Sequence, residues 1–154
     1  MNEQLKDIHR RAFEIKVEVM EGGKLPFKAH LTDAGFDVFA TYDFTIQPGE
    51  VIKHPLNIKM HLPRGTYASI ESKSGLGAKG LLVYAGVIDE GYRGVPHVVG
   101  AHIYQTGMPI KIKKGDKLAQ FIVYPFNAQY YIEQVDHVDD GTERGGGGFG
   151  STGN

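Results

Sequence analysis

The stretch Phe13-Glu14-Ile15-Lys16-Val17-Glu18-Val19 decides the fold class, because apolar and charged residues alternate along it. A period of two predicts a strand with one buried face. Further short strand-like runs follow, among them Leu118–Tyr124 and Tyr130–Val135, and turns such as Gln47-Pro48-Gly49 separate them. Many short strands without a long amphipathic helix predict an all-β protein, either a barrel or a sandwich.

Composition limits the classes of protein to which the chain can belong. At 154 residues with 41% hydrophobic residues, it is long enough for one domain with its own core. The 17 basic and 18 acidic residues give a net charge of −1, so the charge balance offers no basis for nucleic-acid binding. Without cysteine, neither disulfides nor a thiolate metal site can form. No apolar run is long enough to span a membrane, and we expect a soluble cytoplasmic protein.

The chain divides into a β domain over residues 1–138, with residues 1–12 as an N-terminal arm, and a glycine-rich segment over residues 139–154. This last segment reads Arg144-Gly-Gly-Gly-Gly-Phe149-Gly-Ser151-Thr152-Gly-Asn154. Its glycine content alone indicates a flexible tail. An arginine that can bind phosphate, a ring that can stack on a base and two hydroxyls favour a lid that closes over a nucleotide phosphate.

A carboxylate stands between an apolar pair and a glycine-rich turn in Tyr84-Ala-Gly86-Val87-Ile88-Asp89-Glu90-Gly91-Tyr92-Arg93-Gly94. An aspartate at such a strand end can act as a general base on water, and Tyr92 can bring its ring beside a sugar. An aspartate that caps a β-turn, with Tyr92 as ordinary packing, fits the same residues equally well.

Three weaker motifs carry polar groups at strand ends or inside strands. Ser72–Gly80 combines hydroxyls, glycines and Lys73 and is similar to an anion-binding loop, although the motif taken alone favours a solvated turn between strands. Asp37 stands where an alternating strand begins. It is interpreted either as an acid near a metal–phosphate site or as an ordinary residue of a turn and strand start. Gln120 lies in an otherwise apolar strand, so it needs a hydrogen-bond partner from the backbone or from a ligand.

These five segments occur together, in this order, between Ala34 and Gly153, and together they resemble the trimeric dUTPase family. The resemblance implies a β-clip fold, a distorted jelly-roll barrel, in a homotrimer whose active sites are shared between subunits. It also implies hydrolysis of dUTP to dUMP and pyrophosphate, with Asp89 as the base that activates the attacking water. The residues that it places against substrate are Lys73, Ser74, Gly75, Val83, Gly86, Val87, Ile88, Tyr92, Gln120, Arg144, Phe149, Gly150, Ser151 and Thr152.

The resemblance also implies which part of the substrate each of these residues contacts. Main-chain groups around Val83, Gly86 and Ile88 would read the uracil edge, and Tyr92 would exclude a 2′-hydroxyl. Lys73, Ser74 and Gly75 would hold phosphate oxygens, and Gln120 would approach the phosphates from another subunit.

Of the remaining implied roles, Mg²⁺ would travel on the triphosphate, with Asp37 reaching it through water. Arg144 would contact phosphate, Phe149 would stack on uracil, and Ser151 and Thr152 would hold the γ-phosphate.

The chain departs from the usual family pattern in three places. Lys73 stands where the family usually has arginine, Tyr84 is bulky for the uracil-reading hairpin, and residues 95–105 look longer than the usual connection. A dCTP deaminase or bifunctional deaminase–diphosphatase of the same fold, with Glu90 as its base, is one alternative function. A regulatory protein that senses dUTP is another, and the sequence names no protein partner for it.

Overall fold

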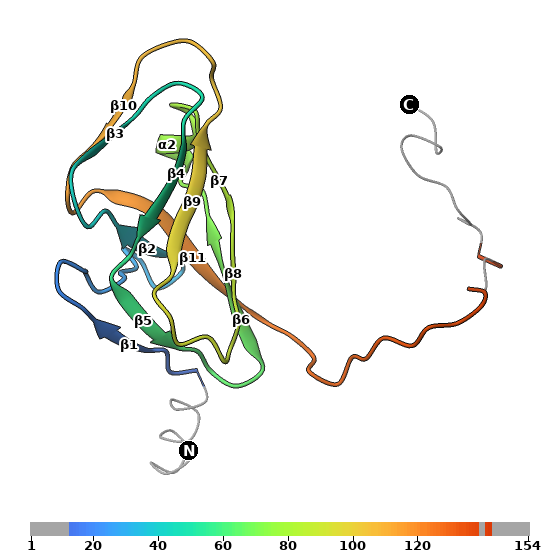
Figure 1. Cartoon of the computed structure of the whole chain (residues 1–154). Coiled ribbons are helices and arrows are strands. Elements are labelled where there is room, and N and C mark those ends of the chain that lie inside the picture. Colours follow the sequence, from blue (N-terminus) through green and yellow to red (C-terminus); the bar gives the residue numbers. More distant parts are fainter. Residues whose placement is uncertain (1–12, 139–140, 143–154) are drawn as a thin grey trace, which may run out of the picture.

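Short strands separated by turns make up almost all of the regular structure in the computed structural model, which describes residues 13–138 and 141–142 (Figure 1). The strands are β1 (Lys16–Val19), β2 (Phe36–Phe39), β3 (Phe44–Ile46), β4 (Val51–Pro55), β5 (Ile58–His61), β6 (Thr66–Glu71), β7 (Leu81–Ala85), β8 (Val87–Ile88), β9 (His97–His102), β10 (Ile110–Ile112) and β11 (Lys117–Pro125). Among these residues the only helix is α2 (Ser74–Gly77), and no helix has the length and apolar character needed to cross a bilayer. The predicted all-β class is therefore confirmed.

The strands form four antiparallel sheets, two of which bear on the candidate site. The largest has the order β2-β11-β6-β8, so β11 pairs with β2 on one side and with β6 on the other. A second sheet has the order β4-β9-β7, and the pairs β1-β5 and β3-β10 complete the body. The strand β11 is the longest of these strands, and it lies inside its sheet because it pairs with β2 and β6.

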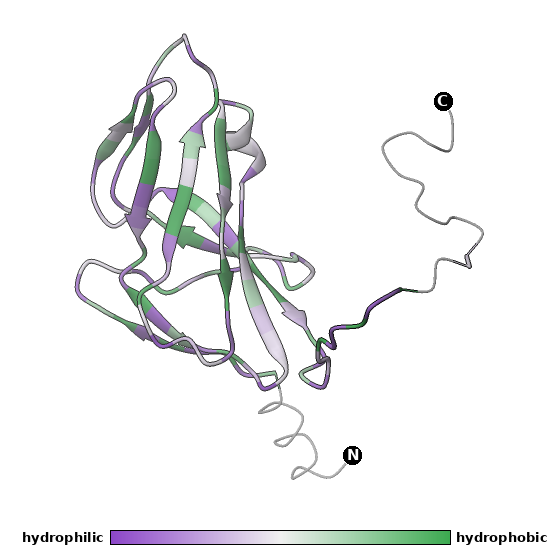
Figure 2. Ribbon diagram, turned by 45° about the vertical axis from the view of Figure 1, so that its right-hand side comes forward, coloured by the Kyte–Doolittle hydropathy of each residue, from purple (hydrophilic) through white to green (hydrophobic). Residues whose placement is uncertain are grey.

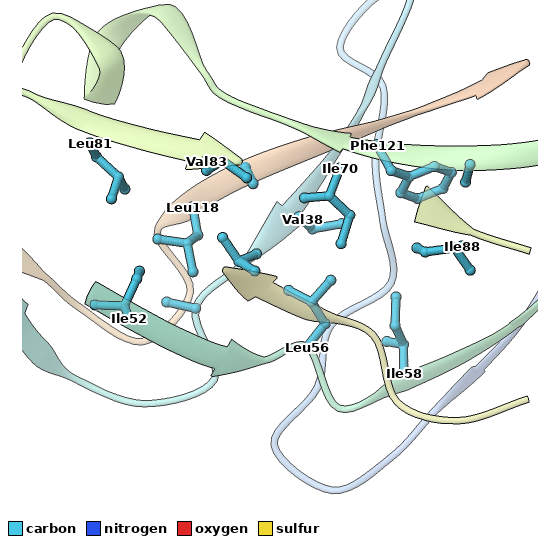
Figure 3. Packing of buried hydrophobic residues seen from close by; sticks show 14 of the residues in the cluster. Val38, Ile52, Leu56, Ile58, Ile70, Leu81, Val83, Ile88, Leu118 and Phe121 are labelled. Carbon is cyan, nitrogen blue, oxygen red and sulfur yellow. The ribbon is translucent and has the colours of Figure 1, made fainter. Parts of the chain in front are cut away.

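Apolar side chains from the sheets meet in one core. Burial alternates along β4 and β9, which follows from the two-residue period of a strand with one covered face. Figure 2 shows the same alternation of hydrophobic and hydrophilic residues along several strands. In Figure 3 the side chains of Val38, Ile70 and Leu118 point toward those of Leu56 and Ile58. Each fully buried side chain of this size contributes about 1.5–3 kcal/mol to folding.

Two strand predictions need correction. The alternation of residues 13–19 forms a strand only from Lys16, because β5 offers partners only from His61 to Ile58. Tyr130–Val135 was predicted as a strand and this is wrong: within the described chain these residues pair with no strand, and Tyr130 is 85% exposed. A strand needs a neighbour for its backbone groups, and residues after β11 lead away from the body (Figure 1).

A neutral histidine is enclosed by the fold. His54 on β4 is buried, and its ring lies 4.4 Å from that of Tyr42 and 4.6 Å from that of Phe44, centroid to centroid. Its Nε2 accepts a hydrogen bond from the Thr41 N–H at 2.8 Å. Burial, and secondly the charge of His97, lower the pKa of His54 to about 4. The imidazole is therefore neutral in the folded protein at ordinary pH.

This histidine predicts an acid-sensitive stability. Between pH 6.5 and about pH 4 the unfolded chain binds a proton at His54 that the folded chain does not bind. The free energy of unfolding therefore falls as the pH drops through this window and keeps its full value above it, a change of at most about 3 kcal/mol. Urea unfolding of His54→Gln at several pH values should show a flatter dependence than the wild type. His30→Gln, which changes an exposed histidine, should keep the wild-type slope, and an unchanged slope in His54→Gln would contradict the assignment.

Candidate functional site

Gly86, the strand β8 and the turn after it border a cavity of about 240 Å³. Five predicted residues line it, namely Gly86, Val87, Ile88, Asp89 and Tyr92. The sequence did not point to the other lining residues, which are Ile70, Val95, Pro96 and His97. Ile70 and His97 belong to strands, and Val95 and Pro96 lie in the segment directly before β9, so no motif distinguishes these four residues.

Asp89 lies at the edge of this cavity, and its carboxylate has no hydrogen-bond partner among the described residues. Ile88 is buried and pairs with Ala68 of β6, which fixes the strand end directly before Asp89. The turn then closes through the Tyr92 N–H, which donates to the Asp89 carbonyl at 3.0 Å. The Asp89 side chain is exposed and forms no hydrogen bond or ion pair within the part of the chain that the structure describes. It is free to accept a hydrogen bond from water.

The Tyr92 ring forms a fixed wall of the same cavity. Its hydroxyl donates to the Val95 carbonyl at 3.2 Å, and the ring lies so close to Gly94 that a Cβ there would overlap it. The Val83 side chain, in contrast, is buried on β7 outside this cavity, and the Val83 N–H donates to Ser72 Oγ at 2.9 Å. The structure therefore brings Tyr92, but not Val83, to the cavity wall.

A second cluster surrounds Asp37 on β2. The Lys73 ammonium donates to Asp37 Oδ1, and the Lys117 ammonium donates to Oδ2 at 2.7 Å. Asp37 is 7% exposed, and burial alone would raise its pKa, but the hydrogen bonds and charges of Lys117 and Lys73 outweigh burial and hold the pKa below its usual value. The cluster is a carboxylate with one ammonium on each oxygen.

Gln120 belongs to this second cluster. It pairs with Asp37 across β2 and β11, so both side chains lie on the same face of the sheet. Its Nε2 donates to the Ser72 carbonyl at 3.1 Å, and its side chain packs so closely on Gly35 that a Cβ there would overlap it. The partner that the sequence left open is thus a backbone carbonyl.

The loop that was expected to bind anions forms the single helical turn α2. It begins at Ser74, and the Ala78 N–H donates to the Ser74 carbonyl at 2.9 Å. Amide groups in a first turn have no partner within the helix. Gly75 is exposed, and a Cβ added there would meet no atom within 4 Å, so a ligand can approach these amides closely.

Lys117 is the charged residue that sequence reasoning missed. The register of β11 against β2 shifts between Lys117 and Ala119, as in a β-bulge. The extra residue lets Lys117 face the same side as Gln120, three positions later, which strict alternation excludes. The bulge interrupts the alternation at the adjacent apolar residues Leu118 and Ala119, but this pattern alone does not indicate the pairing with β2 that brings Lys117 to Asp37.

The two clusters lie far apart within one chain. Asp37 is on β2 and Asp89 follows β8, and these are the two edge strands of the sheet β2-β11-β6-β8. Strands are spaced about 4.8 Å apart, so three steps separate these edges by roughly 14 Å. The Asp89 cavity and the Asp37 cluster of one chain therefore lie at opposite edges of the same sheet.

The predicted site residues near the C-terminus cannot be placed relative to either cluster. Arg144, Phe149, Gly150, Ser151 and Thr152 lie outside the described residues, as do residues 1–12. Within residues 13–138 and 141–142, no three His, Cys, Asp or Glu side chains gather as a metal-binding group.

The Asp37 cluster predicts a measurable titration. Lys117→Gln removes one ammonium from the carboxylate, so the pKa of Asp37 should rise toward its usual value. NMR of the Asp37 carboxyl carbon against pH would measure this change. Lys113→Gln, at an exposed position in the same turn region, should leave the titration as it is. An equal curve for wild type and Lys117→Gln would show that the ion pair does not hold this charge.

Known proteins are similar to this chain in sequence and in fold. A model of the dUTPase family matches residues 22–153. The chain is 42% identical to the human mitochondrial deoxyuridine 5'-triphosphate nucleotidohydrolase over 139 residues, which are 86% of this chain and 52% of that protein, so it spans about half the length of this relative. It is 45% identical over 132 residues to the enzyme of the same name from Clostridium kluyveri, covering 84% of this chain and 90% of that one.

Solved structures agree with these matches. A Staphylococcus bacteriophage 80alpha dUTPase solved with dUPNHPP has a TM-score of 0.81 and 25% identity, over 92% of this chain and 99% of that one. The family match extends over the Asp37 cluster, the Asp89 turn and the glycine-rich end of the sequence. The chain therefore belongs to the dUTPase family.

Proposed function

We propose that this protein hydrolyses dUTP to dUMP and pyrophosphate. One observation carries the proposal. The Asp89 carboxylate lies without hydrogen-bond partners at the edge of a cavity, and the Tyr92 ring, whose hydroxyl donates to Val95, forms part of the wall of that cavity. Membership of the dUTPase family and the names of the human and Clostridium relatives support the same substrate.

In this reaction Asp89 accepts a proton from a water molecule as its oxygen attacks the α-phosphorus. The new bond joins the water oxygen to that phosphorus, and the bond from the α-phosphorus to the bridging oxygen of pyrophosphate breaks. Water is a poor nucleophile, so a positioned base accelerates the step by about 10²–10⁴-fold. An aspartate without competing partners is suited to this work because its lone pairs are available.

The cavity would take the nucleoside. Main-chain groups of Gly86 and Ile88 would read the uracil edge, with Val87 beside them, and the Val83 N–H would tie β7 to Ser72. The Tyr92 ring cannot move aside easily, because its hydroxyl is bonded and its face lies on Gly94. It would reject a ribonucleotide by occupying the space of the 2′-hydroxyl.

The Asp37 cluster would take the phosphates. Lys73, the Ser74 hydroxyl and the Gly75 amide are charged or polar donors at the start of α2, and Gln120 lies beside them. Arg144 on phosphate, Phe149 on uracil and Gly150, Ser151 and Thr152 around the γ-phosphate complete the proposal. Lysine carries a point charge where arginine offers a planar fork, so Lys73 would hold phosphate by its charge and single hydrogen bonds, without a bidentate contact.

Mg²⁺ is proposed to arrive on the triphosphate as part of the substrate. Magnesium is usually held by substrate phosphates and one or two carboxylates, with several waters retained. Asp37 suits an outer position of this kind, since its oxygens already accept hydrogen bonds from the ammonium groups of Lys73 and Lys117. Bound magnesium would neutralise charge on the triphosphate.

The protein is proposed to act as a homotrimer with shared sites. Because the Asp89 cavity and the Asp37 cluster lie at opposite edges of one sheet, a second subunit must supply the phosphate-binding groups to each Asp89. Exposed apolar residues after β11, such as Tyr130, Tyr131 and Ile132, offer a surface for a neighbouring subunit.

The alternative of a deaminase finds less support. It would need Glu90 as the base on water, but the Glu90 carboxylate accepts a hydrogen bond from the Gly65 N–H at 2.7 Å and is not part of the cavity wall. Incubation with dCTP and detection of dUTP would test this activity directly.

Asp89→Asn is expected to lower kcat for dUTP by about 10²–10⁴-fold while binding of a non-hydrolysable dUTP analogue is kept. The amide has nearly the same shape but cannot take the proton from water. Pyrophosphate release measures the rate, with dTTP, dCTP and UTP in parallel. Asp43→Asn, which keeps an acceptor for the Lys114 N–H, should behave as wild type. If Asp89→Asn retains more than about a tenth of the rate, the proposed base is wrong.

Mixed trimers test the sharing of sites. Light scattering should give about 50.7 kDa, three times the 16.9 kDa of the chain. Asp89→Asn and Lys73→Met should each be inactive alone, whereas co-expressed mixed trimers should recover about a quarter of the wild-type sites. A site built within one chain would recover nothing, because every chain carries one defect.

A further inference from the structure

The turn that carries Asp89 is held by very little secondary structure. The strand before it, β8, has only two residues, which pair with Ala68 and Ser69 of β6. After Ile88 the backbone leaves the sheet and closes on itself, with the Arg93 guanidinium donating to the carbonyls of Glu90 and Tyr92 at 2.7 and 2.9 Å. These bonds shape the turn but do not fix it to the rest of the domain.

The Glu90 side chain supplies the missing attachment. Its Oε2 accepts a hydrogen bond from the Gly65 N–H at 2.7 Å, and Gly65 lies directly before β6. Continuing the pairing of Ala68 with Ile88 would bring Thr66 opposite Glu90. The carboxylate thus prolongs the β6–β8 ladder at the point where the backbone no longer can.

Gly65 joins this attachment to the end of β11. Its carbonyl accepts a hydrogen bond from the Phe126 N–H at 2.9 Å, directly after Pro125. One peptide turn therefore holds the Asp89 turn through its N–H and the start of the segment after β11 through its carbonyl. Within the described residues, the Glu90 bond is the only side-chain hydrogen bond from residues 89–93 to another element.

We propose that Glu90 is a positioning residue for Asp89, acting through its hydrogen bond to Gly65. The proposal rests on the function proposed above and adds to it: Glu90 touches neither water nor substrate, and it fixes the place of the base relative to the α-phosphorus. A misplacement of about 1 Å at a catalytic group can cost about 10²-fold in rate. The important property of Glu90 is its reach and its acceptor oxygen, and not its charge.

Three substitutions separate these properties. Glu90→Gln keeps the length and an acceptor oxygen, Glu90→Asp keeps the charge but is one methylene too short, and Glu90→Ala removes both. Glu90→Ala and Glu90→Asp should lower kcat for dUTP by about 10-fold or more with KM changed less than about twofold, and Glu90→Gln should keep most of kcat. Hydrogen exchange at the Gly65 amide should become faster in Glu90→Ala and Glu90→Asp and stay slow in Glu90→Gln.

Glu50→Ala is the matched control. Glu50 accepts a hydrogen bond from the Gln47 N–H at 2.7 Å in the turn between β3 and β4, so it loses the same kind of bond away from the cavity and should keep both kcat and KM. If Glu90→Ala loses protection at Gly65 but keeps the wild-type kcat, or if Glu90→Gln is as slow as Glu90→Ala, the positioning role is wrong. If the wild type releases no pyrophosphate from dUTP, the proposed function fails first, a result distinct from either of these.

Discussion

The double pairing of β11 is the constraint on which the rest of this structure depends. Because β11 is flanked by β2 and β6, and β6 in turn by β8, the sheet places Asp37 and Asp89 on opposite edges. Backbone hydrogen bonds fix the spacing of the strands, so no side-chain rearrangement can close this separation. This separation is the structural reason for the proposal that each site draws on two copies of the chain.

Charge is concentrated locally on a protein that is nearly neutral overall. The net charge of −1 offers no general attraction for a triphosphate. Lys73 and Lys117 instead meet on a nearly buried carboxylate, which keeps both ammonium groups in place without substrate. Removing Asp37 would leave two neighbouring ammonium groups without their shared counter-charge, whereas removing one lysine would leave the carboxylate paired with the other. The cluster is thus arranged before any ligand binds.

The sequence predicted the fold class and one of the two clusters well. Alternation along the strands gave the all-β class, and the order Val87-Ile88-Asp89 placed a carboxylate at a strand end beside Tyr92, as the structure has it. Lys117 could not be predicted because a bulge, which depends on pairing with β2, reverses its side of the strand. Tyr130–Val135 has the residues of a strand, but pairing requires a partner that local composition does not specify.

The Asp89 turn shows how a carboxylate, here the proposed base, can lack hydrogen-bond partners and still be held in place. A carboxylate bonded to its surroundings loses acceptor capacity for water, whereas an unbonded one on an exposed turn is poorly positioned. Here the hydrogen bonds are carried by the residues that follow: Glu90 reaches Gly65, the Tyr92 hydroxyl reaches Val95, and Arg93 closes the turn. Position is fixed by these neighbours, so the lone pairs of Asp89 stay available for the chemistry.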